Sequence, residues 1–163
     1  MADTKTFRIA IIGMDHVHAG QLYREFNQFA GDRLEWVGYA DTKDCSDELR
    51  AFKFKLNFYV DGMDKLKYYD DYKELLDQNI DIAIVCTDIK QHAEICEETL
   101  ARKIHTVVEK PMATSLEDGI RMYRAAKRST ATLVINWPVA WFPAFNKAKE
   151  LADSGIVGKV LRF

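Results

Sequence analysis

The stretch that decides the fold is FRIAIIGMDHVH, residues 7–18. Its first six residues are almost all apolar, which is typical of a strand buried on both faces of a parallel sheet. Gly13 follows at once, and residues 19–29 then carry Leu22, Phe26 and Phe29 at helical spacing. The run LEWVGYA, residues 34–40, predicts a second strand that closes on Asp41. Together these segments predict a βαβ unit, in which parallel strands are joined by a right-handed helical crossover.

Apolar runs continue to alternate with amphipathic ones. The clearest is DIAIVC at residues 81–86, which predicts a central strand. We expect the other strands at residues 68–69, 104–108 and 131–135. We expect the other helices at residues 45–56 with Asp44 or Ser46 as N-cap, 72–78 with Asp70 or Asp71 as N-cap, 91–102, and after the capping box at Ser115, where Leu116, Ile120 and Tyr123 form an apolar stripe. Six strands alternating with helices predict an α/β fold: a doubly wound parallel sheet of the Rossmann kind in three α/β/α layers.

The last 25 residues have a different pattern. Phe145, Ala148 and Leu151 stripe a helix that ends near Ser154 and Gly155, and residues 160–163 begin an apolar strand. That strand has no partner in the sequence. We therefore expect a dinucleotide-binding domain at residues 1–138, and at 139–163 a linking helix and the first strand of a truncated C-terminal α/β substrate domain. An unpaired apolar strand also favours a homo-oligomer joined through a sheet edge.

The composition excludes several classes of protein. The 163 residues carry a formal net charge of -2, which indicates neither nucleic-acid binding nor attraction to an anionic membrane. The longest apolar runs are strand-length, well short of the roughly 20 residues that span a membrane. Three cysteines form no CxxC pair, so we expect a cytoplasmic protein without a structural zinc site.

The first βα turn is a weak dinucleotide-binding motif. Of the pattern G-x-G-x-x-G only Gly13 is present, since Asp15 and His18 stand at the other glycine positions. Asp41, at the end of the second strand, is placed to accept hydrogen bonds from ribose hydroxyls, which favours NAD; Lys43 leaves NADP open. The alternative is that Asp41 only starts a turn.

Further candidates lie where other strands end. Thr87 and Asp88 could touch a cofactor through a hydroxyl and backbone amides, and Asn136 could lie near substrate. His92 is more consistent with capping or packing its helix. His16, His18 and Asp15 could together bind a metal, but we favour Asp15 as a helix cap with the histidines lining the cleft or packing.

An ordered set of motifs resembles the Gfo/Idh/MocA oxidoreductases. Glu109-Lys110-Pro111 is similar to the family's E-K-P motif, and residues 81–88 with His92 to its D-x-x-x-x-x-T-P-x-x-x-H stretch, Asp88 replacing the proline. Residues 69–76 resemble the segment before that stretch, and residues 154–158 the passage that opens the family's second domain.

The resemblance implies hydride transfer between a nicotinamide and a sugar, polyol or related alcohol. It places Lys110 beside the nicotinamide and the reacting hydroxyl, with Glu109 near the cofactor. An ammonium group there can polarise a developing alkoxide or relay its proton. The alternative for Lys110 is a solvated lysine before a turn proline.

We therefore predict NAD, or NADP, as cofactor and Lys110 as the catalytic residue, with no metal ligands and no activity for this chain alone. A non-catalytic nucleotide- or ligand-binding module is the alternative function. The expected cofactor-binding residues are Gly13, Met14, Asp15, His16, Asp41, Cys86, Thr87, Asp88, His92, Glu109, Lys110 and Asn136.

Overall fold

A computed structural model describes residues 5–42, 52 and 62–161 of the chain. The helix expected at residues 45–56 lies outside the described residues, residue 52 apart. Within the described part no helix is long and apolar enough to cross a membrane.

Six parallel strands form one sheet in the order β3-β2-β1-β4-β5-β6. The chain runs outward from β1 to β3, returns to the other side of β1, and runs outward again to β6. This order confirms the predicted doubly wound topology, and it places the switch point between β1 and β4. The strands are β1 (Phe7–Ile12), β2 (Leu34–Ala40), β3 (Tyr68–Tyr69), β4 (Ile82–Val85), β5 (His105–Glu109) and β6 (Leu133–Asn136).

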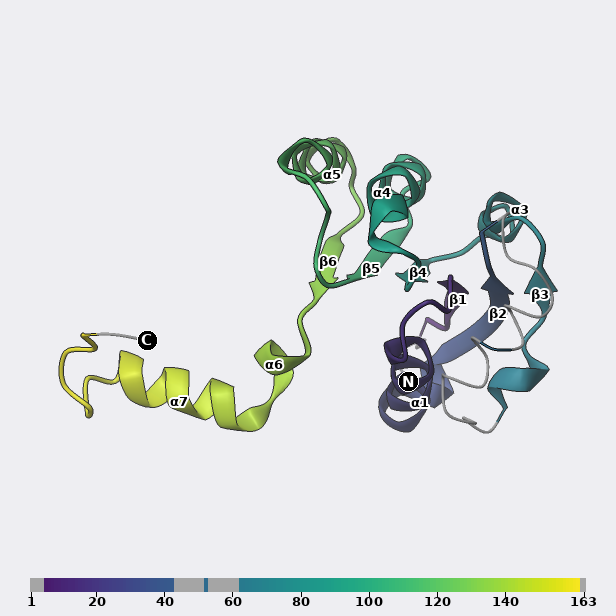
Figure 1. Ribbon diagram of the computed structural model, residues 1–163. Helices are drawn as coiled ribbons and strands as arrows, with labels where there is room; N and C mark the ends of the chain where they lie inside the picture. The colour runs from purple at the N-terminus through teal and green to yellow at the C-terminus, as the bar shows by residue number, and fades with distance from the viewer. Residues whose placement is uncertain (1–4, 43–51, 53–61, 162–163) are drawn as a thin grey trace.

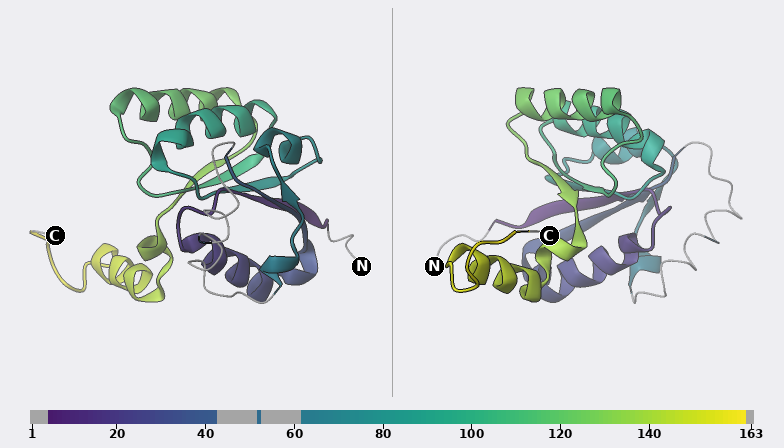
Figure 2. Two further views of the ribbon diagram at one scale, coloured as in Figure 1. Left: turned by 45° about the vertical axis from the view of Figure 1, so that its right-hand side comes forward. Right: turned by 60° about the vertical axis from the view of Figure 1, so that its left-hand side comes forward.

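Helices lie on both faces of this sheet. Figure 1 shows α3, α4 and α5 on one face and α1 on the other. Two short helices end the described chain, and both lead away from the sheet (Figures 1 and 2). The α-helices are α1 (His18–Ala30), α3 (Tyr72–Leu76), α4 (His92–Ala101), α5 (Leu116–Arg128), α6 (Pro138–Trp141) and α7 (Pro143–Asp153); the 3-10 turns are η1 (Gly31–Arg33), η2 (Met63–Lys65) and η3 (Ile89–Gln91).

Alternation along β1 builds a separate core on each face. Ile9 and Ile11 pack with Leu22 and Tyr23 of α1. Ala10 and Ile12 point the other way, into the core made with α3, α4 and α5. Because successive side chains of a strand face opposite sides, the apolar run at residues 9–12 supplies both layers. The three-layer arrangement is thus built around β1.

The prediction that an apolar stripe packs α5 against the sheet is wrong. Leu116 is 81% exposed and Tyr123 58%, whereas Met122 and Ala125 are the buried side chains of this helix. The cap was predicted correctly, because the Ser115 hydroxyl accepts a hydrogen bond from the Asp118 N–H at 3.1 Å. The helix therefore begins where the sequence indicates but packs through a smaller face.

The C-terminal expectations are met only in part. The helix with Phe145 and Leu151 forms as α7, although both side chains are exposed. Val160 and Leu161 are not in a strand, contrary to prediction, and residues 162–163 lie outside the described part. No described strand lies beside them to supply hydrogen-bond partners, as an isolated strand would need.

Candidate functional site

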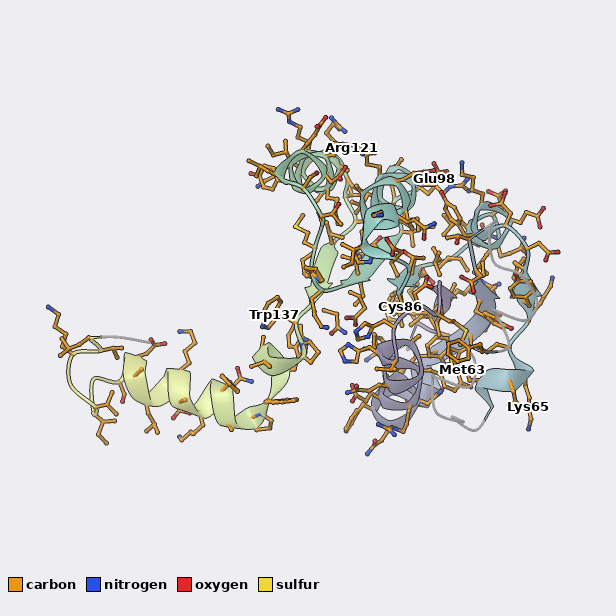
Figure 3. All side chains as sticks on the ribbon, in the orientation of Figure 1. Met63, Lys65, Cys86, Glu98, Arg121 and Trp137 are labelled. Carbon is orange, nitrogen blue, oxygen red and sulfur yellow. The ribbon has the colours of Figure 1, made fainter. Side chains whose placement is uncertain are left out.

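The candidate site lies at the carboxyl edge of the sheet. Residues that follow β1, β2, β4 and β5 and the last residue of β6 meet there because the strands are parallel and in register. Figure 3 labels Cys86, the residue after β4, close to the start of α1, and Trp137, where the chain leaves β6. In an open α/β sheet this edge, at the switch point, is where ligands bind.

Gly13 and Thr87 are in close contact at the switch point. Gly13 has φ +79°, and a Cβ atom there would come within 2.3 Å of Thr87 Cγ2. Its N–H donates to the carbonyl of Ala40 at 2.7 Å, which ties the end of β1 to the end of β2. The turn therefore requires glycine for both conformation and space.

The Thr87 hydroxyl is a buried polar group for which the described residues provide no hydrogen-bond partner. Buried polar atoms in folded proteins nearly always have a partner, and a ligand can supply it. This oxygen and the glycine turn beside it are the features of the edge that fit a dinucleotide best.

Asp15 does not take the capping position predicted for it. The N-cap residue of α1 is Val17, which provides no side-chain hydrogen bond. The Asp15 carboxylate instead accepts a bond from the Asp88 N–H at 3.1 Å, and the Asp15 N–H donates to the Cys86 carbonyl at 2.9 Å. The side chain that replaces the second motif glycine therefore joins the turn after β1 to the turn after β4.

Glu109 is the centre of a buried polar network. This carboxylate is 2% exposed, and its Oε1 lies 3.0 Å from His18 Nδ1. Asn136 Nδ2 also donates to Oε1, and the Lys110 N–H donates to Oε2 at 3.2 Å. Donors from α1, β6 and the end of β5 thus hold one carboxylate, as a buried charge requires.

His16 lies between His18 and Lys110. The two imidazole rings are 4.1 Å apart in an edge-on arrangement, and Lys110 Nζ is 3.4 Å from His16 Nε2. Partial burial has the largest effect and lowers the pKa of His16, and the neighbouring His18 lowers it further; Glu109 raises it, and Lys110 has a smaller lowering effect. The ring is therefore neutral at neutral pH.

One nitrogen or oxygen atom each from His16, His18 and Glu109 lies within 4.8 Å of the other two. The sequence suggested Asp15 as the carboxylate beside these histidines, but the cluster contains Glu109 instead. The His18–Glu109 contact joins residues 91 positions apart. No spacing motif in the sequence indicates this contact. The sequence shows only that His18 begins a helix and Glu109 ends a strand, and that both lie at the carboxyl edge of the predicted sheet.

Several predicted residues have side chains inside the fold. Met14 and Cys86 belong to the core with α1, and burial raises the pKa of the Cys86 thiol well above its usual range. The Asp41 carboxylate is also buried at the end of β2, where its Oδ1 accepts from the Thr42 N–H at 3.1 Å. Contact with a ligand through Met14 or Cys86 would have to use backbone atoms.

His92 is fully buried at the start of α4. Its Nε2 lies 3.2 Å from the Thr87 carbonyl and its Nδ1 3.3 Å from the Met112 carbonyl. The ring therefore joins the loop after β4 to the loop after β5. The structure favours the packing interpretation of His92 over direct contact with a cofactor.

An apolar cavity of about 420 Å³ adjoins the polar network. His18 and Asn136 line it, together with Val107 and Val134 of the sheet face that α1 leaves uncovered. The remaining walls come from α1 and α6, with Phe26, Phe29, Trp141 and Phe142.

Residues 7–137 match the sequence profile of the Gfo/Idh/MocA group, described as an oxidoreductase family with an NAD-binding Rossmann fold. A myo-inositol 2-dehydrogenase of Thermotoga maritima is 29% identical over 152 residues, which are 93% of this chain and 42% of that protein. The chain therefore spans less than half the length of this relative.

Solved structures share the fold. A probable dehydrogenase from Thermotoga maritima superposes with a TM-score of 0.70 at 26% identity, over 93% of this chain and 42% of that one. The WlbA dehydrogenase of Bordetella pertussis, solved with NADH and UDP-GlcNAcA, gives a TM-score of 0.76 at 22% identity, over 95% of this chain and 44% of that one.

Proposed function

Since the chain belongs to the Gfo/Idh/MocA family of oxidoreductases with an NAD-binding Rossmann fold, we propose that its residues 1–138 bind a nicotinamide dinucleotide for hydride transfer to or from a sugar, polyol or related alcohol. The observation that carries this proposal is the contact between Gly13 and Thr87 at the switch point of the sheet, with Lys110 Nζ 3.4 Å from His16 on the same turn as Gly13. NAD is preferred over NADP because an acidic residue, Asp41, directly follows β2.

The chain's own residues have distinct tasks in this proposal. The glycine turn lets backbone approach the pyrophosphate, and the Thr87 hydroxyl gains the hydrogen-bond partner that the described residues do not provide. When bound, the dinucleotide supplies the hydride acceptor or donor. Lys110 polarises the reacting oxygen and holds or returns its proton, while Glu109 and Asn136 position the end of β5.

Lys110 has a local environment suited to that task. Its neighbour His16 is an uncharged ring at 3.4 Å, and the next residue toward the strand is the buried carboxylate of Glu109. An ammonium group at the carboxyl end of a strand can polarise a reacting oxygen and give a proton to it or take one from it.

Residues 139–163 join this domain, in our proposal, to a C-terminal α/β domain that holds the substrate. The support is that α6 and α7 lead away from the sheet and that the matched segment is 42% of the Thermotoga relative. We also propose a homo-oligomer and a cytoplasmic location, with no nucleic acid or membrane as partner.

Fluorescence titration with NADH and NADPH tests the proposal. We expect saturable NADH binding, and we expect Asp41→Ala to weaken NADH more than NADPH because only the ribose of NADH presents a free 2′-hydroxyl to a carboxylate. Equal losses for both nucleotides would remove Asp41 from the ribose site. No binding of either nucleotide by the wild-type chain would overturn the proposal. Binding without turnover on any polyol or sugar by a longer form would support the non-catalytic module.

A further inference from the structure

We propose that His16, His18 and Glu109 form a binding site for one divalent transition-metal ion, with zinc as the preferred ion. Its test does not require a bound nucleotide. It rests on the grouping of two imidazoles and one carboxylate from two different parts of the chain.

The donor set and its spacing suit zinc. Zinc takes imidazole nitrogen and carboxylate oxygen at about 2.0–2.2 Å, so neighbouring ligand atoms of a tetrahedral ion lie about 3.3 Å apart. His18 Nδ1 and Glu109 Oε1 are already 3.0 Å apart, and all three ligand atoms lie within 4.8 Å of one another. A small inward movement of the His16 ring therefore completes the set, and that ring sits on a turn and is only half-buried.

The surroundings of Glu109 match those of a ligating carboxylate. Asn136 Nδ2 donates to Oε1 and the Lys110 N–H donates to Oε2, which fixes the orientation of the group while leaving each oxygen a free lone pair. Such outer hydrogen bonds orient metal ligands and strengthen binding. In the metal-free state His18 N–H fills the remaining position on Oε1, and a bound ion would replace that proton.

Lys110 is the residue that opposes metal binding. Its ammonium group lies 3.4 Å from His16 Nε2, where a dication would raise the local positive charge. The side chain is long and half-buried, so it can swing aside, but it competes for the same space. Because of this competition, we predict that removal of the Lys110 side chain increases the affinity for the metal.

Three protein ligands leave an ion with an open coordination position. In zinc enzymes that position holds water or a substrate oxygen, and the ion acts as a Lewis acid. Here it would lie beside Lys110 and at the His18–Asn136 end of the apolar cavity. The ligand class implied is an oxygen-bearing substrate group, such as a hydroxyl or carbonyl.

Calorimetric titration with zinc chloride, on untagged protein freed of metal by a chelator, tests the site. We expect one zinc per chain, and a His16→Ala/His18→Ala variant that shows no saturable binding. Asn136→Ala should weaken binding by about tenfold, as loss of an outer hydrogen bond does. Lys110→Ala should tighten it by on the order of tenfold, because a unit charge near a dication is removed.

The matched control is His105→Ala. His105 is exposed at the amino end of β5, the same strand whose carboxyl end carries Glu109. Its loss should leave zinc affinity unchanged. Circular dichroism checks folding of each variant, and His16→Asn replaces the double variant if that one does not fold.

Cobalt absorption and anomalous scattering at the zinc edge locate the ion. We expect d–d bands of a four- or five-coordinate cobalt, and an anomalous peak between His16, His18 and Glu109. Unchanged zinc affinity in both His16→Asn and Glu109→Gln, or weaker binding in Lys110→Ala, would overturn the proposal. NADH titration of the metal-free protein is a separate measurement, so either proposal can fail alone.

Discussion

Gly13 combines two constraints that the fold places on one residue. The backbone is left-handed there, with φ +79°, and the space where a side chain would start is filled by Thr87. A left-handed conformation costs a non-glycine residue about 1–2 kcal/mol, and the contact adds to that. Substitution of Gly13 should therefore cost more stability than substitution of a turn glycine that has only a left-handed conformation.

We expect Gly13→Ala to destabilise the protein by about 1–3 kcal/mol and to weaken NADH binding, because β1 and Thr87 must move apart. Urea unfolding and NADH titration measure the two effects. Gly119→Ala is the matched control: Gly119 lies inside α5, and apart from its chain neighbours and the helix's own backbone nothing lies within 4 Å of the added methyl group. There alanine should stabilise by about 0.5–1 kcal/mol. If Gly13→Ala and Gly119→Ala changed the free energy of unfolding in the same direction, the geometry described for Gly13 would be contradicted.

Glu109 is a second position where one side chain serves several elements. Glu109→Gln keeps the shape but removes the charge that His18 and Asn136 both address. We expect a loss of about 1–3 kcal/mol in the free energy of unfolding, since buried donors lose an acceptor. Urea unfolding measures this, with the exposed Glu117→Gln expected to change stability by less than about 0.5 kcal/mol. Equal effects of the two substitutions would show that the buried network adds nothing.

For single residues, the sequence predicted which side chains lie at the site better than it predicted their hydrogen-bond partners. Gly13 and Thr87 were identified because they lie at the ends of predicted strands, which can be read from apolar runs. Lys110 was identified from the resemblance of Glu109-Lys110-Pro111 to the E-K-P motif. The partner of Asp15 was predicted wrongly, and the pairing of His18 with Glu109 was not foreseen. Both depend on the rotation of α1 about its axis and on which strands neighbour each other, and local sequence carries neither.

Among the elements, α5 combines a well-capped N-terminus with a small buried face. Ser115 caps its first turn, and Glu117 and Asp118 add negative charge near the N-terminus. The buried face is limited to side chains such as Met122 and Ala125. Its stability therefore depends on the cap more than that of a deeply buried helix would.

We expect Ser115→Ala to lower the free energy of unfolding by about 1 kcal/mol, because the Asp118 N–H loses its acceptor. Ser115→Asp retains a capping oxygen and should stay close to wild type. Chemical denaturation of the two variants side by side is the measurement. A Ser115→Asp variant as unstable as Ser115→Ala would exclude the cap as the cause.

Asp81 directly precedes β4 and joins it to β1 and β5 at the amino edge of the sheet: its N–H donates to the Arg8 carbonyl at 2.8 Å, and its carbonyl accepts from the His105 N–H at 2.9 Å. Its Oδ2 accepts from the Arg8 N–H at 2.9 Å, and its Oδ1 pairs with Lys5 Nζ at 2.7 Å. Burial alone would raise the pKa of this carboxyl, but the Arg8 N–H and Lys5 outweigh burial and hold the pKa below its ordinary value. The charged form is thus the one that stabilises the fold.

The sign of the pH effect follows from that shift. A carboxyl whose pKa is lower in the folded state stabilises the protein above its unfolded-state pKa, and the stabilisation is lost as pH falls through the folded-state value. We expect Asp81→Asn to be less stable than wild type at pH 7 and to lose less stability on acidification below about pH 4. Unfolding curves across that range test this, and parallel pH dependences would contradict it.

The elements also show where sequence patterns reach their limit. Strands were found because a segment buried on both faces is apolar throughout, as residues 9–12 of β1 and all of β4 are. The stripe Leu116, Ile120 and Tyr123 had helical spacing yet faces solvent, and Phe29 of α1 is 80% exposed. Periodicity identifies an apolar face but not what covers it.

For the whole molecule, the strand order carries the functional argument. The order β3-β2-β1-β4-β5-β6 follows from alternating strands and helices with right-handed crossovers, and it brings five strand ends to one edge. The apolar cavity between α1, β6 and α6 lies next to that edge on one face of the sheet. The polar network around Glu109 and the apolar cavity therefore meet at His18 and Asn136.

The most direct test of the account is a crystal structure of the chain with NAD⁺ at saturating concentration. We predict that density for the dinucleotide crosses the Gly13 turn, contacts the Thr87 hydroxyl, and places the nicotinamide beside Lys110. Density confined to the apolar cavity, or lying against the amino edge of the sheet near Asp81, would contradict it.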